Sequence, residues 1–205
     1  MIKPILLAAA VLGAAVTPAS AQPATAADAP KADLVAVAID TSLGRIMVAV
    51  DQAHAPITTA NFLRYVDTQR FDGQTFYRAM KTGADGGLIQ GGVTSDARKH
   101  LPPIAHEPTS ATGLKHVAGA LSMARLAPGS AKADFFILTT DIPGFDAGGP
   151  GGDADGFAVF GHVVEGMDVV KAIFAAPTSA TKGEGVMKGQ MLDPTVKIVR
   201  MARIK

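Results

Sequence analysis

The sequence TFYRAM at residues 75–80, followed after a turn by LIQGG at residues 88–92, decides how the chain is expected to fold. The two stretches predict short strands over residues 74–80 and 87–90, because aromatic and aliphatic side chains dominate both. Six further runs of this kind are bounded by turn-forming residues: 34–39, 44–50, 119–124, 134–139, 157–164 and 195–204. The sequence therefore predicts eight short strands.

Two segments have the periodicity of short amphipathic helices. Residues 56–66 begin with Pro56, which suits the first turn of a helix, and residues 167–174 carry an apolar stripe that ends before Pro177. Eight strands and two helices predict a mainly β fold, a closed eight-stranded antiparallel barrel with the helices on its ends, because closure removes exposed strand edges. We expect one such domain, over residues 34–205.

The composition fits a turn-rich protein and excludes several chemistries. The chain has 205 residues, with 22 Gly and 13 Pro, so turns are expected to be frequent. It has no Cys, which excludes disulfides, a thiol nucleophile and cysteine-ligated metal sites. The five histidines have no metal-ligand spacing, and we expect neither a metal nor a cofactor. Asp153-Ala154-Asp155-Gly156 matches only part of a calcium-binding loop, so a solvated hairpin is the preferred interpretation.

The N-terminus has the pattern of an export signal. Lys3 precedes an apolar stretch over residues 5–16, and Ala19-Ser20-Ala21 is a small-residue cleavage signal. The apolar stretch is too short for a membrane-spanning helix, which needs about 20 residues. We therefore predict a signal peptide over residues 1–21, a flexible tether over residues 22–33, and a mature protein in the bacterial periplasm or outside the cell.

The charge of the mature chain argues against two classes of partner. The formal net charge of the full sequence is +1, and removal of Lys3 with the signal peptide reduces it to zero. Because the chain also has no basic cluster, we expect no binding to nucleic acid or to an anionic membrane surface. We expect the protein to be a monomer.

A series of motifs, in order along the chain, resembles the cyclophilin-type peptidyl-prolyl isomerases. The motifs are Thr59-Ala60-Asn61-Phe62, Phe76-Tyr77-Arg78, Ile89-Gln90-Gly91-Gly92, Gly119-Ala120-Leu121-Ser122-Met123-Ala124, Phe135-Phe136-Ile137 and Phe157-Ala158-Val159-Phe160-Gly161-His162-Val163. The resemblance runs from Gly44 to about Ile173. It implies an eight-stranded antiparallel barrel with two capping helices. It also implies an isomerase that acts on proline-containing peptides and, in an exported protein, on unfolded exported proteins.

The isomerisation of a proline peptide bond calls for a fixed hydrogen-bond donor. Rotation about an X-Pro bond must overcome a barrier of about 18–20 kcal/mol, because amide resonance is lost. In the twisted state the prolyl nitrogen gains a lone pair, which such a donor stabilises selectively. Arg78 is the candidate catalytic residue because it is always charged and rich in N–H donors. Gln90 is expected to hold the substrate carbonyl or backbone.

Further residues are expected to bind the substrate. Phe136, Leu88 and Phe145 are candidates for the apolar pocket around the proline ring. Because Phe135 and Phe136 are neighbours in a strand, they must face opposite sides, so one of them belongs to the core. The segment Ala124-Arg125 is expected to bind an extended peptide through main-chain groups.

Several positions of the expected pocket depart from the family pattern. Phe157 stands where the resemblance implies histidine and Asp134 where it implies glutamine; both stay in the expected substrate-binding set. Gly87 stands in place of an aromatic residue. The late loop, where the family has Trp or Phe, offers Gly144 or Phe145, and the chain has no Trp. We therefore expect weak binding of cyclosporin.

Two alternatives to an isomerase remain open. One is a proline-peptide-binding chaperone of the same fold, in which the altered pocket residues have weakened catalysis. The other is a carbohydrate- or lipid-binding barrel outside the family. Retention of Arg78 favours the enzyme.

Overall fold

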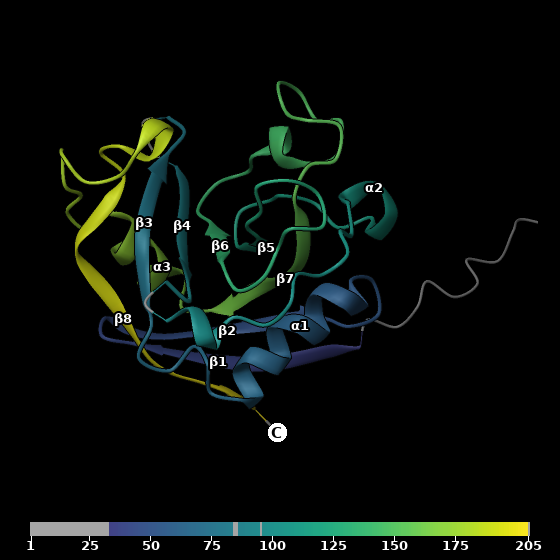
Figure 1. The fold of residues 1–205 in the computed structure, drawn as a ribbon, viewed down its shortest axis with the longest axis horizontal. Helices are drawn as coiled ribbons and strands as arrows, with labels where there is room; N and C mark the ends of the chain where they lie inside the picture. Colours follow the sequence, from purple (N-terminus) through teal and green to yellow (C-terminus); the bar gives the residue numbers. More distant parts are fainter. Residues whose placement is uncertain (1–32, 84–85, 95, 205) are drawn as a thin grey trace, which may run out of the picture.

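Eight antiparallel strands close into one barrel in the order β1-β2-β7-β5-β6-β4-β3-β8, as Figure 1 shows. The structure is a computed structural model, and it describes residues 33–83, 86–94 and 96–204. The strands are β1 Leu34–Thr41, β2 Gly44–Asp51, β3 Thr75–Lys81, β4 Gly87–Gly92, β5 Ala120–Met123, β6 Phe135–Leu138, β7 Ala158–Glu165 and β8 Met191–Arg203. The predicted mainly β, closed eight-stranded antiparallel barrel is confirmed.

The two predicted helices are present as α1, Pro56–Asp67, and α3, Met167–Phe174. A third helix, α2 at Thr109–Thr112, was not predicted because four residues of Thr, Ser and Ala have no apolar periodicity. Short 3-10 helices lie at Ala97–Lys99, Pro143–Phe145 and Gly185–Met187. Among the described residues, no helix combines the length and the hydrophobicity that crossing a membrane requires. The predicted signal peptide lies outside those residues, as does the predicted tether apart from Asp33.

The last strand begins earlier than the sequence predicts. The sequence predicts a strand from residue 195, but β8 begins at Met191. Met191 pairs with Arg78 of β3, and Leu192 is buried, whereas Asp193 and the two residues after it are exposed. The prediction was wrong because Asp193-Pro194 has the composition of a turn. The correction places the residues around Met191 next to Arg78.

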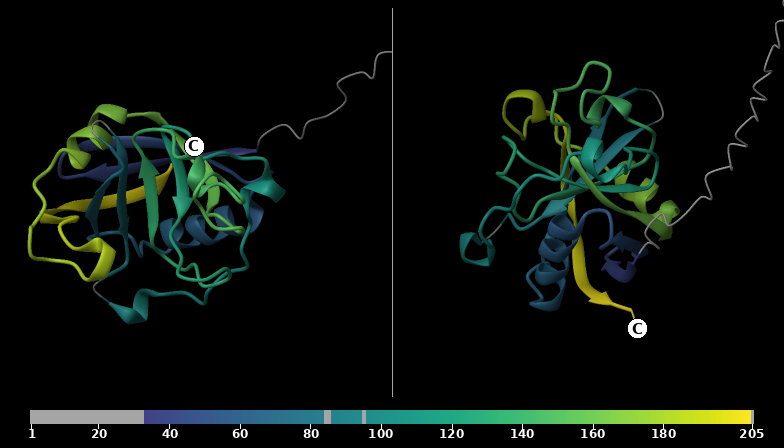
Figure 2. Two further views of the ribbon diagram at one scale, coloured as in Figure 1. Left: turned by 90° about the horizontal axis from the view of Figure 1, so that it is seen from above. Right: turned by 90° about the vertical axis from the view of Figure 1, so that its right-hand side faces the viewer.

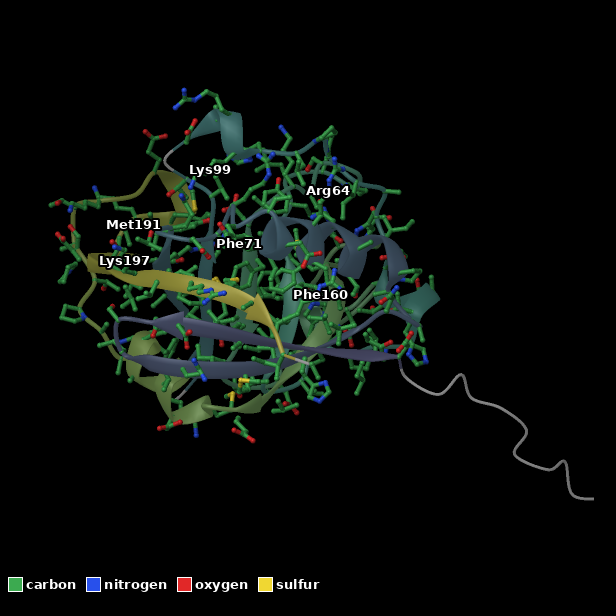
Figure 3. All side chains as sticks on the ribbon, turned by 90° about the horizontal axis from the view of Figure 1, so that it is seen from below. Arg64, Phe71, Lys99, Phe160, Met191 and Lys197 are labelled. Atoms are coloured by element: carbon green, nitrogen blue, oxygen red, sulfur yellow. The ribbon has the colours of Figure 1, made fainter. Side chains whose placement is uncertain are left out.

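The barrel interior is filled by apolar side chains, with a group of aromatic rings at its centre. Phe62 of helix α1 packs against Phe71, Phe135 and Phe160, with ring centroids 5.4, 5.5 and 5.1 Å apart. Figure 3 labels Phe71 and Phe160 beside this helix. All four rings are at most 1% exposed. Because the interior is packed, a ligand site must lie on the outer face of the barrel.

A distant side chain holds the N-terminus of helix α1. The Glu107 carboxylate accepts hydrogen bonds from the backbone N–H groups of Ile57 and Thr58, at 3.0 and 2.7 Å, and from the Thr58 hydroxyl at 2.6 Å. These bonds satisfy N–H groups that the helix itself leaves unpaired. They also fasten the long segment between β4 and β5 to the barrel. The left view of Figure 2 shows this segment on the same side as the loop before β8.

Candidate active site

A β-bulge in strand β3 places two consecutive side chains on the outer face of the barrel. Phe76 pairs with Gly91 of β4 and Arg78 pairs with Gln90, so Tyr77 is an extra residue in the ladder. Phe76 and Ala79 point into the core, whereas Tyr77 and Arg78 are partly exposed. Strict alternation would have turned one of these two neighbours inward. The bulge is therefore what brings Arg78 to the surface beside Tyr77.

The guanidinium of Arg78 is held by two glutamine side chains. Its Nε and Nη2 donate to Oε1 of Gln190, at 2.8 and 2.6 Å, and its Nη1 donates to Oε1 of Gln90 at 2.9 Å. A guanidinium has five N–H donors, so these three bonds leave two donors for a ligand. Burial lowers the pKa of Arg78, but a guanidinium remains charged at neutral pH. Arg78 is thus a fixed cation with free donors and no carboxylate partner among the described residues.

The amide of Gln90 connects Arg78 to a second group of polar side chains. Its Nε2 donates to the Tyr77 hydroxyl at 2.7 Å, while its Oε1 accepts from Arg78. The two bonds fix the orientation of the amide. The Tyr77 phenol in turn interacts with the Asp134 carboxyl, and burial raises the pKa of both groups. A polar network therefore runs from Arg78 to Asp134 through Gln90 and Tyr77.

Four predicted substrate-binding residues gather in an apolar cluster on the outer face. Phe136 and Leu88 are each 3% exposed, and the partly exposed Phe145 and Phe157 pack against them. The Phe136 ring lies 5.7 Å from that of Phe145 and 5.4 Å from that of Phe157. Its neighbour Phe135 is in the barrel core. The prediction that these consecutive phenylalanines face opposite sides is confirmed.

The register of the sheet aligns the site in one row. Arg78 on β3 pairs with Gln90 on β4, Gln90 pairs with Phe136 on β6, and Phe136 pairs with Ser122 on β5. Directly paired residues point to the same side of a sheet, and neighbouring strands are about 4.8 Å apart. The long Arg78 side chain can therefore reach a ligand that rests on Phe136.

Gly87 narrows the range of side chains that this surface could carry. A Cβ at Gly87 would lie 1.8 Å from the Met80 carbonyl oxygen on β3, so no larger residue fits without moving a strand. On this backbone, position 87 has no room for the aromatic residue that the family resemblance implies there. The aromatic side chains of the apolar cluster are those of Phe136, Phe145 and Phe157.

The side chain of Arg125 forms its hydrogen bonds with other groups of the protein. It donates to both carboxylate oxygens of Asp153, each at 3.0 Å, and to the Gly156 carbonyl oxygen, and its guanidinium lies 5.1 Å from the Phe157 ring centroid. Only 4% of the side chain is exposed. The substrate role predicted for Ala124-Arg125 can therefore involve the main chain but not this guanidinium. The same contacts make Asp153 the acceptor of a structural ion pair within the glycine-rich loop.

A buried hydrogen-bond network supports Phe136 from behind. His116 Nδ1 lies 2.8 Å from Asp146 Oδ1 and His116 Nε2 lies 3.0 Å from Ser122 Oγ. Burial lowers the pKa of His116, so the neutral ring donates from Nδ1 and accepts from the Ser122 hydroxyl. The hydrogen-bonded series Ser122–His116–Asp146 has the residue types of a hydrolase triad, but Ser122 is 0% exposed. The network stacks His116 against Phe136, with centroids 6.1 Å apart, and offers no accessible nucleophile.

A cavity of about 780 Å³ adjoins the apolar cluster. Its lining includes four residues predicted from sequence: Gln90, Ala124, Arg125 and Asp134. The structure thus divides the predicted site residues between two neighbouring areas. Phe136, Leu88, Phe145 and Phe157 form the apolar cluster, and Arg78 with Gln90 stands at the boundary.

Sequence reasoning missed three site residues, Gln190, Tyr77 and His116. Gln190 belongs to a polar loop whose sequence gives no sign of proximity to β3. Tyr77 lies within a family motif but had no predicted role, and His116 was considered only as one of five histidines without metal-ligand spacing. Within residues 33–83, 86–94 and 96–204, no group of three or more His, Cys, Asp or Glu could hold a metal ion.

Comparison with solved structures shows the same fold in a protein of low sequence identity. A cyclophilin type peptidyl-prolyl cis-trans isomerase from Cryptosporidium parvum has a TM-score of 0.67 and 18% identity, over 84% of this chain and 98% of that one. A second structure of that protein, in the presence of the dipeptide Ala-Pro, has a TM-score of 0.66 and 20% identity, over 83% and 99% of the two chains.

Sequence comparisons show closer relatives. The peptidyl-prolyl cis-trans isomerase cyp18 of Streptomyces antibioticus is 37% identical over 150 residues, which cover 72% of this chain and 87% of the relative. Peptidyl-prolyl cis-trans isomerase B of Escherichia coli is 36% identical over 146 residues, or 69% and 85% of the two chains. The family model for cyclophilin type peptidyl-prolyl cis-trans isomerase/CLD matches residues 36–203. The chain therefore belongs to the cyclophilin-type peptidyl-prolyl cis-trans isomerases, and the isomerase predicted from sequence is confirmed at the level of the family.

Proposed function

We propose that this protein catalyses rotation about X-Pro bonds, with Arg78 as the donor that stabilises the twisted amide. The observation that carries the proposal is the row of Arg78, Gln90 and Phe136 across three neighbouring strands. A proline ring packed on Phe136 places its nitrogen within reach of the two free Arg78 donors. The Cryptosporidium parvum cyclophilin was crystallised in the presence of Ala-Pro, which supports a ligand of this class.

The proposed mechanism stabilises charge without transferring a proton. In the planar amide the prolyl nitrogen lone pair is delocalised, so Arg78 has little to bind in the ground state. As the bond twists, the nitrogen becomes pyramidal and accepts a hydrogen bond from the guanidinium. Gln90 and Gln190 hold the cation in advance, so little reorganisation is needed at the moment of rotation. The apolar cluster anchors the ring while the acyl part of the peptide turns.

We propose further that the substrates are proteins that fold after export from the cytoplasm. The support is the signal-like sequence of residues 1–21, with its basic start, apolar stretch and small-residue cleavage signal. We expect a mature protein that begins at Gln22 and is found in the periplasm or the medium. N-terminal sequencing of the protein from cell fractions tests this, and an uncleaved cytoplasmic protein would contradict it.

A proline-peptide-binding chaperone is the second candidate function. The observation that favours it is the altered rim of the apolar cluster, where Gly87 has no room for a side chain and Phe157 replaces the expected histidine. In that case the protein binds proline peptides with little acceleration of rotation. The two candidates differ in whether Arg78 controls a rate or only an affinity.

The isomerisation of an Ala-Pro peptide by the wild type, Arg78→Ala and Arg78→Lys distinguishes the two. We expect Arg78→Ala to lower kcat/KM by about 10²–10³-fold, the usual effect of removing one preorganised donor. Arg78→Lys keeps the charge but loses the planar donor array, so we expect only partial recovery. Unfolding curves must show equal stability for the three proteins. Equal rates in all three would contradict the enzyme mechanism.

A further inference from the structure

The loop between β6 and β7 carries two aromatic side chains of the apolar cluster at the point where it closes on itself. The Phe157 backbone N–H donates to the Phe145 carbonyl oxygen at 2.9 Å, and the two ring centroids are 5.0 Å apart. We call these two residues the neck of the loop. Both rings also contact Phe136, on which the proline ring is proposed to rest. The position of the neck therefore decides the shape of the proline site.

The loop has few side chains of its own with which to fix that position. Five of the eleven residues between Phe145 and Phe157 are glycine. Gly156, directly before Phe157, has a φ of 58°, and a Cβ there would lie 2.5 Å from the Phe145 carbonyl oxygen, so a larger residue would have to move the backbone. A segment rich in glycine loses much conformational entropy when it is ordered. Contacts from outside the loop must therefore hold the neck in place.

The first half of the neck is held by the buried His116. Its backbone N–H and its Nδ1 lie 3.1 and 2.8 Å from Oδ1 of Asp146, the residue after Phe145. The His116 carbonyl oxygen accepts a hydrogen bond from the Ile142 N–H at 2.9 Å. These three bonds fix the backbone on both sides of Phe145. They act on residues 142–146 and not on Phe157.

The second half of the neck is held by Arg125, in the segment after β5. Its Nε donates to the Gly156 carbonyl oxygen at 2.9 Å, and its Nη2 donates to both carboxylate oxygens of Asp153, each at 3.0 Å. The same guanidinium lies 5.1 Å from the centroid of the Phe157 ring, within the range of a cation–π interaction. Because only 4% of the Arg125 side chain is exposed, water competes little with these contacts.

We propose that Arg125 is a positioning residue of the proline site, which fixes Phe157 and thereby sets the affinity for the proline ring. The inference rests on the proposed function, because it takes Phe136 as the place where the ring binds. An apolar pocket holds the ring equally well in the planar and in the twisted amide. Loss of the Phe157 position should therefore raise KM and leave kcat unchanged, whereas a residue that acts on the twisted amide changes kcat.

The test compares the wild type with Arg125→Met and Arg125→Lys, using an Ala-Pro peptide for kinetics and for calorimetric affinity. Arg125→Met keeps an apolar stem and removes the charge and every donor. We expect its KM and its dissociation constant to rise about tenfold, with kcat within about twofold of the wild-type value. Arg125→Lys keeps the charge but loses the planar donor array, so we expect a smaller rise. A merely structural role would reduce the folded fraction and leave KM unchanged.

Hydrogen exchange of the Phe157 amide reports on the neck without any substrate. This N–H is bonded to the Phe145 carbonyl oxygen, so it exchanges only when the neck opens. In Arg125→Met we expect its exchange to become about tenfold faster relative to that of Ile137, a buried residue of β6 that reports on global unfolding. An unchanged ratio would overturn the proposal.

Two control variants show whether the effect is specific to Arg125. Arg45→Met breaks another arginine–carboxylate pair, with Asp40 on the hairpin of β1 and β2, and should leave KM at the wild-type value. His106→Ala removes a contact with the same loop, between Nε2 and the Asp155 carbonyl oxygen 3.0 Å away, and leaves the contact between Arg125 and Phe157 in place. We expect KM of His106→Ala to change by less than about twofold. A rise equal to that of Arg125→Met would overturn the proposal.

The outcomes separate this proposal from the proposed function. A wild-type KM in Arg125→Met, or a fall in kcat alone, overturns the role of Arg125 and leaves the isomerase intact. If the wild type binds the peptide but does not accelerate rotation, the isomerase proposal fails, and the calorimetric affinities with the Phe157 exchange still decide the role of Arg125. If Arg125→Met does not fold, Asp153→Ala repeats every measurement at a side chain that is 56% exposed, because it removes two of the Arg125 bonds.

Discussion

The two faces of strands β3, β4 and β6 carry residues of opposite kinds. The inner face presents Phe76, Ile89 and Phe135, each 0% exposed and packed against other apolar side chains. The outer face of the same strands presents Arg78, Gln90 and Phe136, the last within the apolar cluster. Neighbouring residues in one strand thus have different roles. The inner face should set the free energy of unfolding, and the outer face should set the rate of the reaction.

The largest expected effect comes from exchanging one aromatic residue on each face. Phe135→Ala should lower the free energy of unfolding by about 3–5 kcal/mol, because the packed barrel cannot close over the lost ring. Phe136→Ala should destabilise less, since its rim can rearrange, and should lower kcat/KM for an Ala-Pro peptide. Urea unfolding and kinetics on the folded fraction measure both. An equal loss of kcat/KM in the two variants would contradict the expectation that only the outer face sets the rate.

An intermediate effect is expected from Gln190, a positioning residue that holds Arg78. Gln190→Leu removes the acceptor for two Arg78 donors, so we expect kcat to fall about tenfold with little change in KM. Gln190→Glu keeps an acceptor oxygen and should restore most of the rate. If Gln190→Leu changes KM alone, or if Gln190→Glu is equally slow, Gln190 does not position the guanidinium.

The smallest expected effect concerns the pH dependence of stability. Burial depresses the pKa of His116 below its ordinary value of 6.5, so the unfolded chain binds a proton more readily than the folded one. Stability from this residue is complete above pH 6.5 and is lost as the pH falls towards the folded pKa, by at most about 1.4 kcal/mol per pH unit. We expect the free energy of unfolding, measured with urea at pH 7, 6 and 5, to fall less steeply with decreasing pH in His116→Asn than in the wild type. Identical slopes would contradict a buried neutral ring.

The fold could be predicted because its strands and helices are marked by local patterns. Seven of the eight strands begin within one residue of the predicted start, since hydrophobic runs and turn residues delimit them. The exception is β8, where Asp193-Pro194 has the composition of a turn although it lies within the strand. Helix α2 carries no periodic apolar pattern, so no local signal marked it.

The candidate site could be predicted only where a family motif carried the information. Arg78, Gln90 and Phe136 came from motifs, and the structure brings them into one row. The contact between Gln190 and Arg78 joins residues 112 positions apart, and no periodicity encodes such a contact. The partition of the predicted residues into an apolar cluster and a cavity likewise depends on packing. The ion pair between Arg125 and Asp153 could not be predicted either, because it depends on tertiary structure.

The bulge at Tyr77 has a consequence for how such a site can arise or be lost. Each residue of a regular strand has a fixed parity, inward or outward, and no substitution changes it. The extra residue reverses the parity of everything beyond it, which is why Phe76 and Ala79 both face the core with two outward residues between them. Deleting Tyr77 would leave the composition of the strand almost unchanged, yet a regular strand has room for only one outward side chain there. The proposed catalytic arrangement therefore depends on the number of residues in β3 as much as on their chemistry.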